Sequence, residues 1–222
     1  MWTPDIGHAS LAAPRRGAAS AEIPMRLGFW RFVIPALALT GALAACESPP
    51  PRPTFPDIRF SSERPIRLAV SGVDVQSNFR PSFQAPHVEH LFPVPPARAI
   101  ENWAHDRLAA GGGNARARFV IEDASVIEVE LKKKEGGITG AFTKEPAQRY
   151  DATVAVTLQI IDDHGVPVRT VSVKASRSQS VLEGITPNDR DKTWYDMTTA
   201  LMADFNQQMS QEISDHFGGY FQ

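Results

Sequence analysis

The feature that most constrains the fold is a strict alternation of apolar side chains at every second position of residues 150–160. This period predicts a β-strand with one buried face and one face toward solvent. The apolar face of such a strand must be covered by another layer. The chain supplies one further on, where an apolar stripe at helical spacing runs from Trp194 to Phe217 over more than six turns. Together these segments predict an α+β fold, with a long helix packed on a sheet.

The remaining elements complete a β-α-β-β-β-α order. A first helix is expected from Pro96 to the glycines at 111–113, and Asn188 or Asp189 is expected to cap the last helix. Three further strands are predicted at 66–73, at 115–131 with a bend or bulge near 123–125, and at 171–175. We therefore expect a mostly antiparallel four-stranded sheet with two helices on one face, in which only the crossover through the first helix can bring in a parallel pair.

Cys46 is the only cysteine in the 222 residues, and it follows a short apolar run. A basic stretch beginning at Met25 precedes that run, and a proline-rich stretch follows Cys46. The run is shorter than the roughly 20 residues that span a bilayer, and Pro35 interrupts it. Residues 25–45 are therefore predicted to be a secretory signal peptide rather than a membrane helix.

The tetrapeptide Leu43-Ala44-Ala45-Cys46 resembles the lipobox of bacterial lipoproteins. The resemblance implies a diacylglyceryl thioether on Cys46, cleavage before it, and acylation of the new amino group. Glu47, rather than the Asp associated with inner-membrane retention, implies the outer membrane as the more favoured location. The chain then divides into a misassigned or disordered extension, the signal peptide, a lipidated proline-rich tether and one periplasmic domain, at 1–24, 25–45, 46–65 and 66–222.

The segment 150–220, a strand, a turn and the long helix, is similar to periplasmic lipoproteins that assist envelope machines. These are the auxiliary lipoproteins of ABC-type lipid transporters and the lipoprotein partner of the lipopolysaccharide-export barrel. The resemblance implies a non-catalytic accessory that binds an envelope protein or lipid. Two alternatives stay open: a periplasmic carrier of a lipid or ligand, and, less favoured, a membrane-tethered enzyme.

Chemical motifs give little support to catalysis. The sequence has no nucleophile elbow, P-loop, HExxH or CxxC pattern. His87, Glu89 and His90, with His105 further on, are the nearest approach to a metal set, but they lie in a proline-rich loop, and we expect exposed histidines instead. Asp162-Asp163-His164 is interpreted as a hairpin turn. We expect no catalytic residue, no metal and no cofactor.

Charge and exposed side chains point to protein or lipid partners. The chain has a formal net charge of −2, and removal of residues 1–45 takes away four arginines and two carboxylates, which leaves −4 and argues against nucleic-acid binding. Lys132, Lys133, Lys134 and Phe142 form a basic, glycine-rich hairpin loop, which suits an anionic lipid surface or a protein partner unless it is a solvated tip. The aromatic residues of loop 76–95 cover the core edge or meet a partner, and 177–180 is a polar strand end that could do the same.

Overall fold

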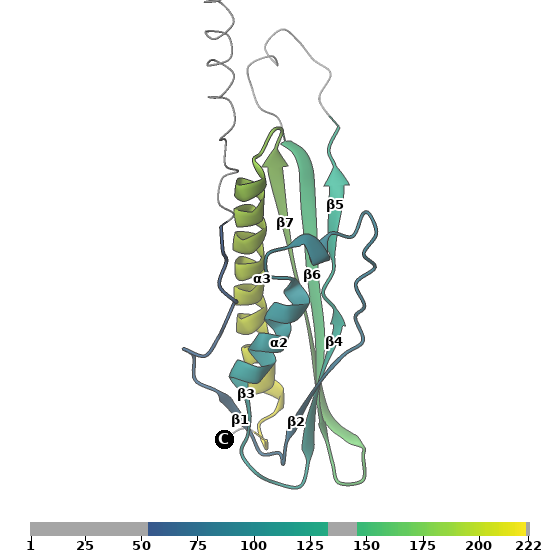
Figure 1. The fold of residues 1–222 in the computed structure, drawn as a ribbon. Coiled ribbons are helices and arrows are strands. Elements are labelled where there is room, and N and C mark those ends of the chain that lie inside the picture. Colours follow the sequence, from purple (N-terminus) through teal and green to yellow (C-terminus); the bar gives the residue numbers. More distant parts are fainter. Residues whose placement is uncertain (1–52, 133–145, 221–222) are drawn as a thin grey trace, which may run out of the picture. The chain divides into compact units, whose positions relative to one another are not determined.

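The computed structural model describes residues 53–132 and 146–220, and these form an α+β domain (Figure 1). Both α-helices lie on the same side of the main sheet, as the sequence predicts. The elements in chain order are β1 Ile66–Leu68, β2 Val73–Ser77, the 3-10 helix η1 Glu89–Leu91, α2 Pro96–Arg107, β3 Leu108–Ala110, β4 Arg116–Asp123, β5 Val126–Glu130, β6 Pro146–Ile161, β7 Pro167–Leu182 and α3 Pro187–His216.

Strand β6 is the centre of the main sheet. It pairs antiparallel with β7 along one edge, and with β4 and then β5 along the other. β4 and β5 are the two halves of the strand predicted at 115–131, with a register shift between Ile121 and Asp123 and a break at 124–125. The predicted bend near 123–125 is confirmed, and it lets one long segment follow β6 on a single side.

The start of the domain departs from the prediction. The strand expected at 66–73 is two strands: β1 pairs with β3 in a small separate sheet, while β2 joins the main sheet parallel to β4. The chain changes sheets at Ser71, whose backbone N–H and side chain both bond the carbonyl of Ala115 at 2.8 and 2.9 Å. The main sheet is therefore mixed, and its parallel pair is connected through α2 as predicted.

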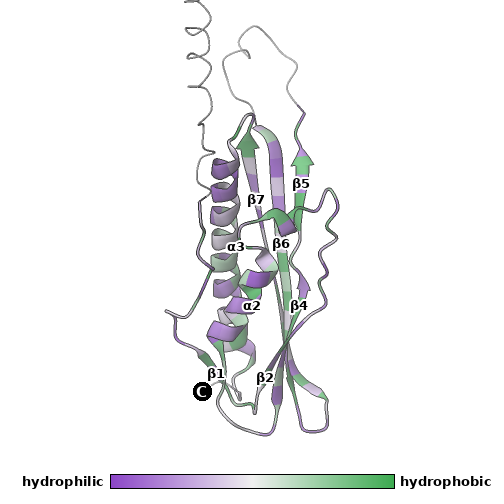
Figure 2. Ribbon diagram, in the orientation of Figure 1, coloured by the Kyte–Doolittle hydropathy of each residue, from purple (hydrophilic) through white to green (hydrophobic). Residues whose placement is uncertain are grey.

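The core lies between the main sheet and the helices. Alternate residues of β6 are buried, which confirms the period-2 prediction, and they face the apolar side of α3. Trp103 of α2 packs between the ring of Phe119 on β4, with centroids 5.7 Å apart, and that of Phe205 on α3 at 5.2 Å. Figure 2 shows that much of the visible side of α3 is hydrophilic, as expected for a helix with one buried stripe.

The N-terminus of α3 is capped by Thr186, so the prediction of Asn188 or Asp189 is wrong. The Asp189 N–H donates to Thr186 Oγ1 at 3.2 Å, and Thr186 Oγ1 donates to Asp189 Oδ2 at 2.7 Å. Pro187 occupies the first helical position, where a missing N–H costs nothing, and this moves the cap one residue before it.

Gly113 closes the connection after α2 and β3. Its φ of +123° is strained for other residues, and a Cβ there would lie 2.7 Å from the carbonyl oxygen of Ala69. The glycines at 111–113 therefore allow the backbone to pass close to the β1–β2 connection, after the helix has already ended at Arg107.

Residues 53–65, the described part of the predicted tether, contact the domain. Ile58 and Phe60 are buried in the core. Asp106 at the end of α2 accepts from Arg59 and, at 2.8 Å, from the Phe60 N–H. Burial alone would raise the pKa of Asp106, but the hydrogen bonds from Arg59 and Phe60 hold that pKa below its usual value. The segment is therefore fixed to the helices by both apolar and charged contacts.

Candidate functional site

The predicted lipid anchor and most of the basic loop lie outside the part of the chain that the structure describes. Cys46, Lys133, Lys134 and Phe142 lie outside the described residues. Lys132 is described, and it is exposed just after β5. The predictions for the lipid anchor and for the basic loop therefore remain predictions.

The aromatic residues of loop 76–95 differ in their surroundings: some cover the edge of the core, and one lies at the surface. Phe92 is buried and stacks on Trp194 with ring centroids 4.8 Å apart, and Phe79 packs against the core. Phe83 is 66% exposed, has a φ of +55°, and touches the ring of His90. The loop thus anchors the sheet with Phe92 and leaves Phe83 at the surface.

The same loop covers the outer edge of β5. The Val88 N–H donates to the carbonyl of Val126 at 3.0 Å, and the Glu128 N–H donates to the carbonyl of Pro86 at 2.9 Å. His87 and Ile127 form an isolated antiparallel bridge. This edge of the sheet is therefore already paired.

His87, Glu89 and His90, the nearest approach to a metal-binding set in the sequence, do not converge on one point in the structure. Glu89 is buried, accepts from the Val126 N–H at 3.3 Å, and lies 3.8 Å from His87 Nδ1, while the His90 ring turns toward Phe83. Among the described residues, the side chains that converge are instead Asp162, Asp163 and His164.

That convergence has a structural explanation. Asp162 Oδ1 accepts from the backbone N–H groups of His164 at 3.0 Å and Val166 at 2.8 Å, and Gly165 adopts a φ of +81°. These are the bonds of the predicted hairpin turn between β6 and β7, which is confirmed.

An aromatic cluster joins the start of α3 to the sheet. The rings of Tyr150 and Trp194 meet edge to face with centroids 5.3 Å apart, and the Arg190 guanidinium lies 5.1 Å from the Trp194 ring centroid. Burial raises the pKa of Tyr150 to about 12, with a further contribution from Glu128, whose carboxylate accepts from the Tyr150 hydroxyl at 3.2 Å. The hydroxyl therefore stays protonated as a hydrogen-bond donor, and the cluster is structural.

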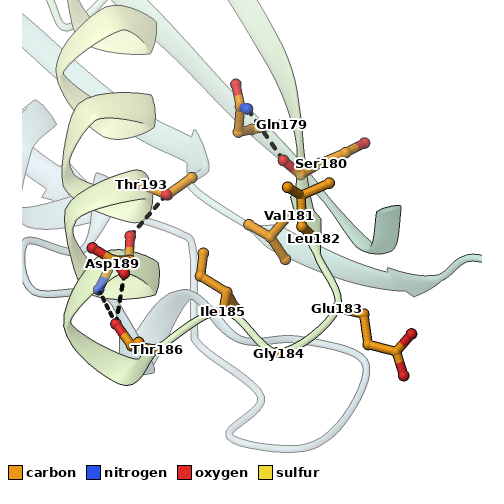
Figure 3. A pocket seen from close by; sticks show the side chains of 10 residues that line it. All are labelled: Gln179, Ser180, Val181, Leu182, Glu183, Gly184, Ile185, Thr186, Asp189 and Thr193. Atoms are coloured by element: carbon orange, nitrogen blue, oxygen red, sulfur yellow. Dashed lines mark hydrogen bonds between the residues drawn. The ribbon is translucent and has the colours of Figure 1, made fainter. Parts of the chain in front are cut away.

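A hollow of about 360 Å³ lies where β7 turns into α3, and Figure 3 shows the side chains that line it. Val181, Leu182 and Ile185 are its apolar lining residues, and Asp189 and Thr193 line it from the helix. The Glu183 side chain points away from the others in this view. The hollow is lined by Gln179, Ser180, Val181, Leu182, Glu183, Gly184, Ile185, Thr186, Asp189 and Thr193.

A second hollow of about 290 Å³ lies further along the same two elements. Its β7 residues are Ser172, Val173 and Lys174, and its α3 residues are Gln207, Gln208, Gln211 and Glu212. Between the two hollows Arg177 Nη2 of β7 bonds Asp204 Oδ2 of α3 at 2.8 Å. We call this strip of β7 and α3, from Ser172 to Leu182 and from Asp189 to Glu212, the edge groove.

The floor of the edge groove is the free edge of β7. Consecutive residues of a strand point to opposite faces of its sheet. Each hollow is nevertheless lined by a run of consecutive β7 residues, 172–174 in one and 179–182 in the other. Main-chain atoms of β7 therefore contribute to both hollows, and α3 forms their other wall.

The sequence prediction missed most of this surface. It placed a strand at 171–175, whereas β7 covers 167–182, because the polar run 176–180 breaks the apolar alternation. The signal that could have found it is the hairpin register. A tight turn at 162–165 pairs the long strand before it, residue by residue, with whatever follows.

Comparison with known proteins identifies no family. No family model and no curated protein matches the sequence. The domain is similar to the solved structure of a minor lipoprotein from Acinetobacter baumannii, at 15% identity and a TM-score of 0.36 over 67% of this chain and 93% of that one. It is also similar to rare lipoprotein B from Shewanella oneidensis, at 10% identity and a TM-score of 0.33 over 65% and 98% of the two chains.

A lipoprotein from Caulobacter crescentus is a third similar structure, at 9% identity and a TM-score of 0.30 over 47% of this chain and 67% of that one. These scores and identities are low, and they assign the chain to no family. Among the described residues, no helix is long and apolar enough to cross a membrane.

Proposed function

We propose that this protein is a lipid-anchored, non-catalytic binding module of a bacterial envelope complex, held to a membrane by Cys46. The outer membrane is the proposed location, because Glu47 follows the cysteine. Lys132, Lys133, Lys134 and Phe142 are proposed to contact an anionic lipid surface or the protein partner.

The observation that carries this proposal is the short distance in sequence between the lipobox and the folded domain. The described chain begins at Pro53, seven residues after Cys46. Its first residues are already held to α2 by Asp106, and the ring of Phe55 packs against that of Tyr195 on α3 with centroids 5.0 Å apart. A lipid on Cys46 would therefore hold the domain close to a membrane. Two or more acyl chains are enough for stable attachment.

The described residues also favour binding over chemistry. Three places where polar side chains come together have structural roles: the turn at Asp162, the clamp at Asp106 and the hydroxyl of Tyr150 bonded to Glu128. The two hollows are open to solvent and lined by both polar and apolar groups, which suits a protein contact better than the enclosed apolar cavity of a lipid carrier.

The test is Cys46→Ser in the natural host. We expect the wild-type protein to fractionate with membranes as a cleaved species, whose intact mass includes the lipid. The variant should accumulate as an uncleaved precursor, because the sulfur that accepts the lipid is absent.

Ala45→Gly is the matched control, because it keeps a small residue beside the same cysteine and should leave processing unchanged. The anchor is excluded if the wild-type protein has a free thiol and retains residues 25–45, or if the serine variant reaches the membrane at mature mass. Separation of the two membranes on a density gradient then tests the outer-membrane location.

A further inference from the structure

The open edge of β7 is the largest backbone surface that the described fold leaves unpaired. β7 has 16 residues, and among the described strands it pairs only with β6. An edge strand presents a row of free N–H and C=O groups. Side chains satisfy two carbonyls near its ends, where Arg169 donates to Val168 and Gln179 donates to Ser180. Between them, within the described chain, the backbone bonds only β6.

The exposure of β7 sets it apart from an ordinary covered edge. Residues 176–180 are all exposed, so both faces of the strand are open there. β5, by contrast, has its outer edge bonded by the loop at 86–88. The edge groove has room on two sides of the Arg177–Asp204 pair, and it exposes the backbone itself.

We propose that the edge groove receives an extended segment of an envelope protein, which adds to the sheet as a strand beside β7 and carries carboxylates next to Lys174. The proposal deepens the binding role given above and rests on it. An added strand gains affinity from main-chain hydrogen bonds and specificity from alternate side chains. Along 172–182 it would extend about 35 Å, at about 3.3 Å per residue.

Charge selects the acidic character of this segment. β7 contains Arg169, Lys174 and Arg177 and no carboxylate. Arg177 is already paired with Asp204, whereas Lys174 is exposed and has no ion pair within the described chain. Lys174 lies opposite Ala155 on the outer face of the sheet. Carboxylates on that face of the added strand would therefore meet an uncompensated cation.

The other charged groups at the groove limit where those carboxylates can lie. On the outer face Asp151 is paired with Arg149 at 2.8 Å. On the α3 wall Glu212 Oε2 lies 3.3 Å from His216 Nδ1, and the Asp189 carboxylate accepts a hydrogen bond from the Thr186 hydroxyl. Residues of the added strand that face α3 therefore meet carboxylates and the amides of Gln207, Gln208 and Gln211. We expect neutral polar side chains at those positions.

The same charges disfavour a second copy of this chain as the occupant. Pairing β7 with β7 would bring together two strands that carry three cations each and no carboxylate. Like charges placed across neighbouring strands are destabilising. Lysine on an edge also discourages pairing with an apolar strand.

The test uses the mature chain with Cys46→Ser and two synthetic peptides of about ten residues. One peptide alternates Glu with Thr, and the other alternates Lys with Thr. Amide exchange measured by NMR should show that the Glu peptide protects alternate amides of 170–180, those that the β6 ladder leaves free. Lys174→Glu should weaken the Glu peptide about three- to fivefold and strengthen the Lys peptide. Arg67→Glu, a charge reversal on β1, should change neither.

The proposal is overturned if the Glu peptide leaves these amides unprotected, if both peptides bind equally, or if protection appears on another element. It is also overturned if the amides are protected without peptide and the chain sediments as a dimer, since the occupant is then a second copy. The peptide experiment uses protein without a lipid, so its outcome does not depend on the anchor. A negative peptide result therefore leaves the anchor proposal standing, and a negative anchor result leaves the peptide result standing.

Discussion

Asp106 is the residue whose removal should most directly detach the N-terminal segment. Its carboxylate holds Arg59 and the Phe60 N–H, and its side chain is only 5% exposed. We expect Asp106→Ala to lower the free energy of unfolding by about 1–3 kcal/mol, since it leaves a buried N–H without a partner. Urea titration of the purified domain measures this loss, and faster trypsin cleavage after Arg59 would show where it acts.

The control is Asp57→Ala, which removes an exposed ion pair with Arg98 and should cost less than about 1 kcal/mol. The contribution of Asp106 also depends on pH. Because its pKa is lower in the folded chain than in the unfolded chain, this contribution is complete above about pH 5 and is lost as the pH falls through the folded-state pKa. Equal losses for the two variants, or an Asp106 effect that does not decrease as the pH falls below about 4, would contradict the clamp.

Tyr150 gives a prediction at the alkaline end. With a pKa of about 12 it should remain protonated while an ordinary tyrosine ionises near pH 10. Absorbance titration of the folded protein should therefore show a late step that Tyr150→Phe removes. Since the unfolded chain loses this proton first, stability should fall from about pH 10 toward pH 12. A Tyr150→Phe titration identical to that of the wild type would refute the assignment.

At the scale of elements, the cap of α3 can be tested independently of the core. Thr186→Ala removes the side chain that accepts from the Asp189 N–H, and we expect a loss of about 1 kcal/mol in thermal or urea unfolding. Thr199→Ala is the matched control, because the Thr199 hydroxyl bonds only its own helix at Tyr195. The prediction fails if the control costs as much as the cap.

The elements also show what the sequence could predict. Alternation at 150–160 and the stripe from Trp194 predicted β6 and α3, because both patterns reflect burial against one layer. The bend at 123–125 was predicted from unbroken parity across a polar gap. The division of 66–73 between two sheets was not predicted. Which strand pairs with β3 and which with β4 is decided by contacts between residues far apart in the sequence.

The sequence predicts less of the candidate site than of the fold. The strand end 177–180 was recognised as a polar surface, but the groove depends on where α3 crosses β7, and periodicity gives no crossing position. Ile58 and Phe60 were read as part of a proline-rich tether, because two apolar residues among prolines carry no period that would indicate burial.

For the whole molecule, we predict that the segment 53–65 belongs to the folding unit. A chain beginning at Ile66 loses Ile58 and Phe60 from the core, which should cost about 3–6 kcal/mol of stability. A chain beginning at Pro53 should unfold like the mature protein. Urea midpoints of the three forms measure the difference, and equal midpoints for the Ile66 and Pro53 chains would show that the segment is dispensable.

The docking of 53–65 has a geometric consequence for a protein fixed at Cys46. The seven residues from Cys46 to Arg52 can reach no more than about 25 Å even when fully stretched. If Cys46 carries a lipid, as proposed, these seven residues limit how far the first described residue, Pro53, can lie from the bilayer surface. Inserting residues into 47–52 would raise this limit by about 3.5 Å for each residue added.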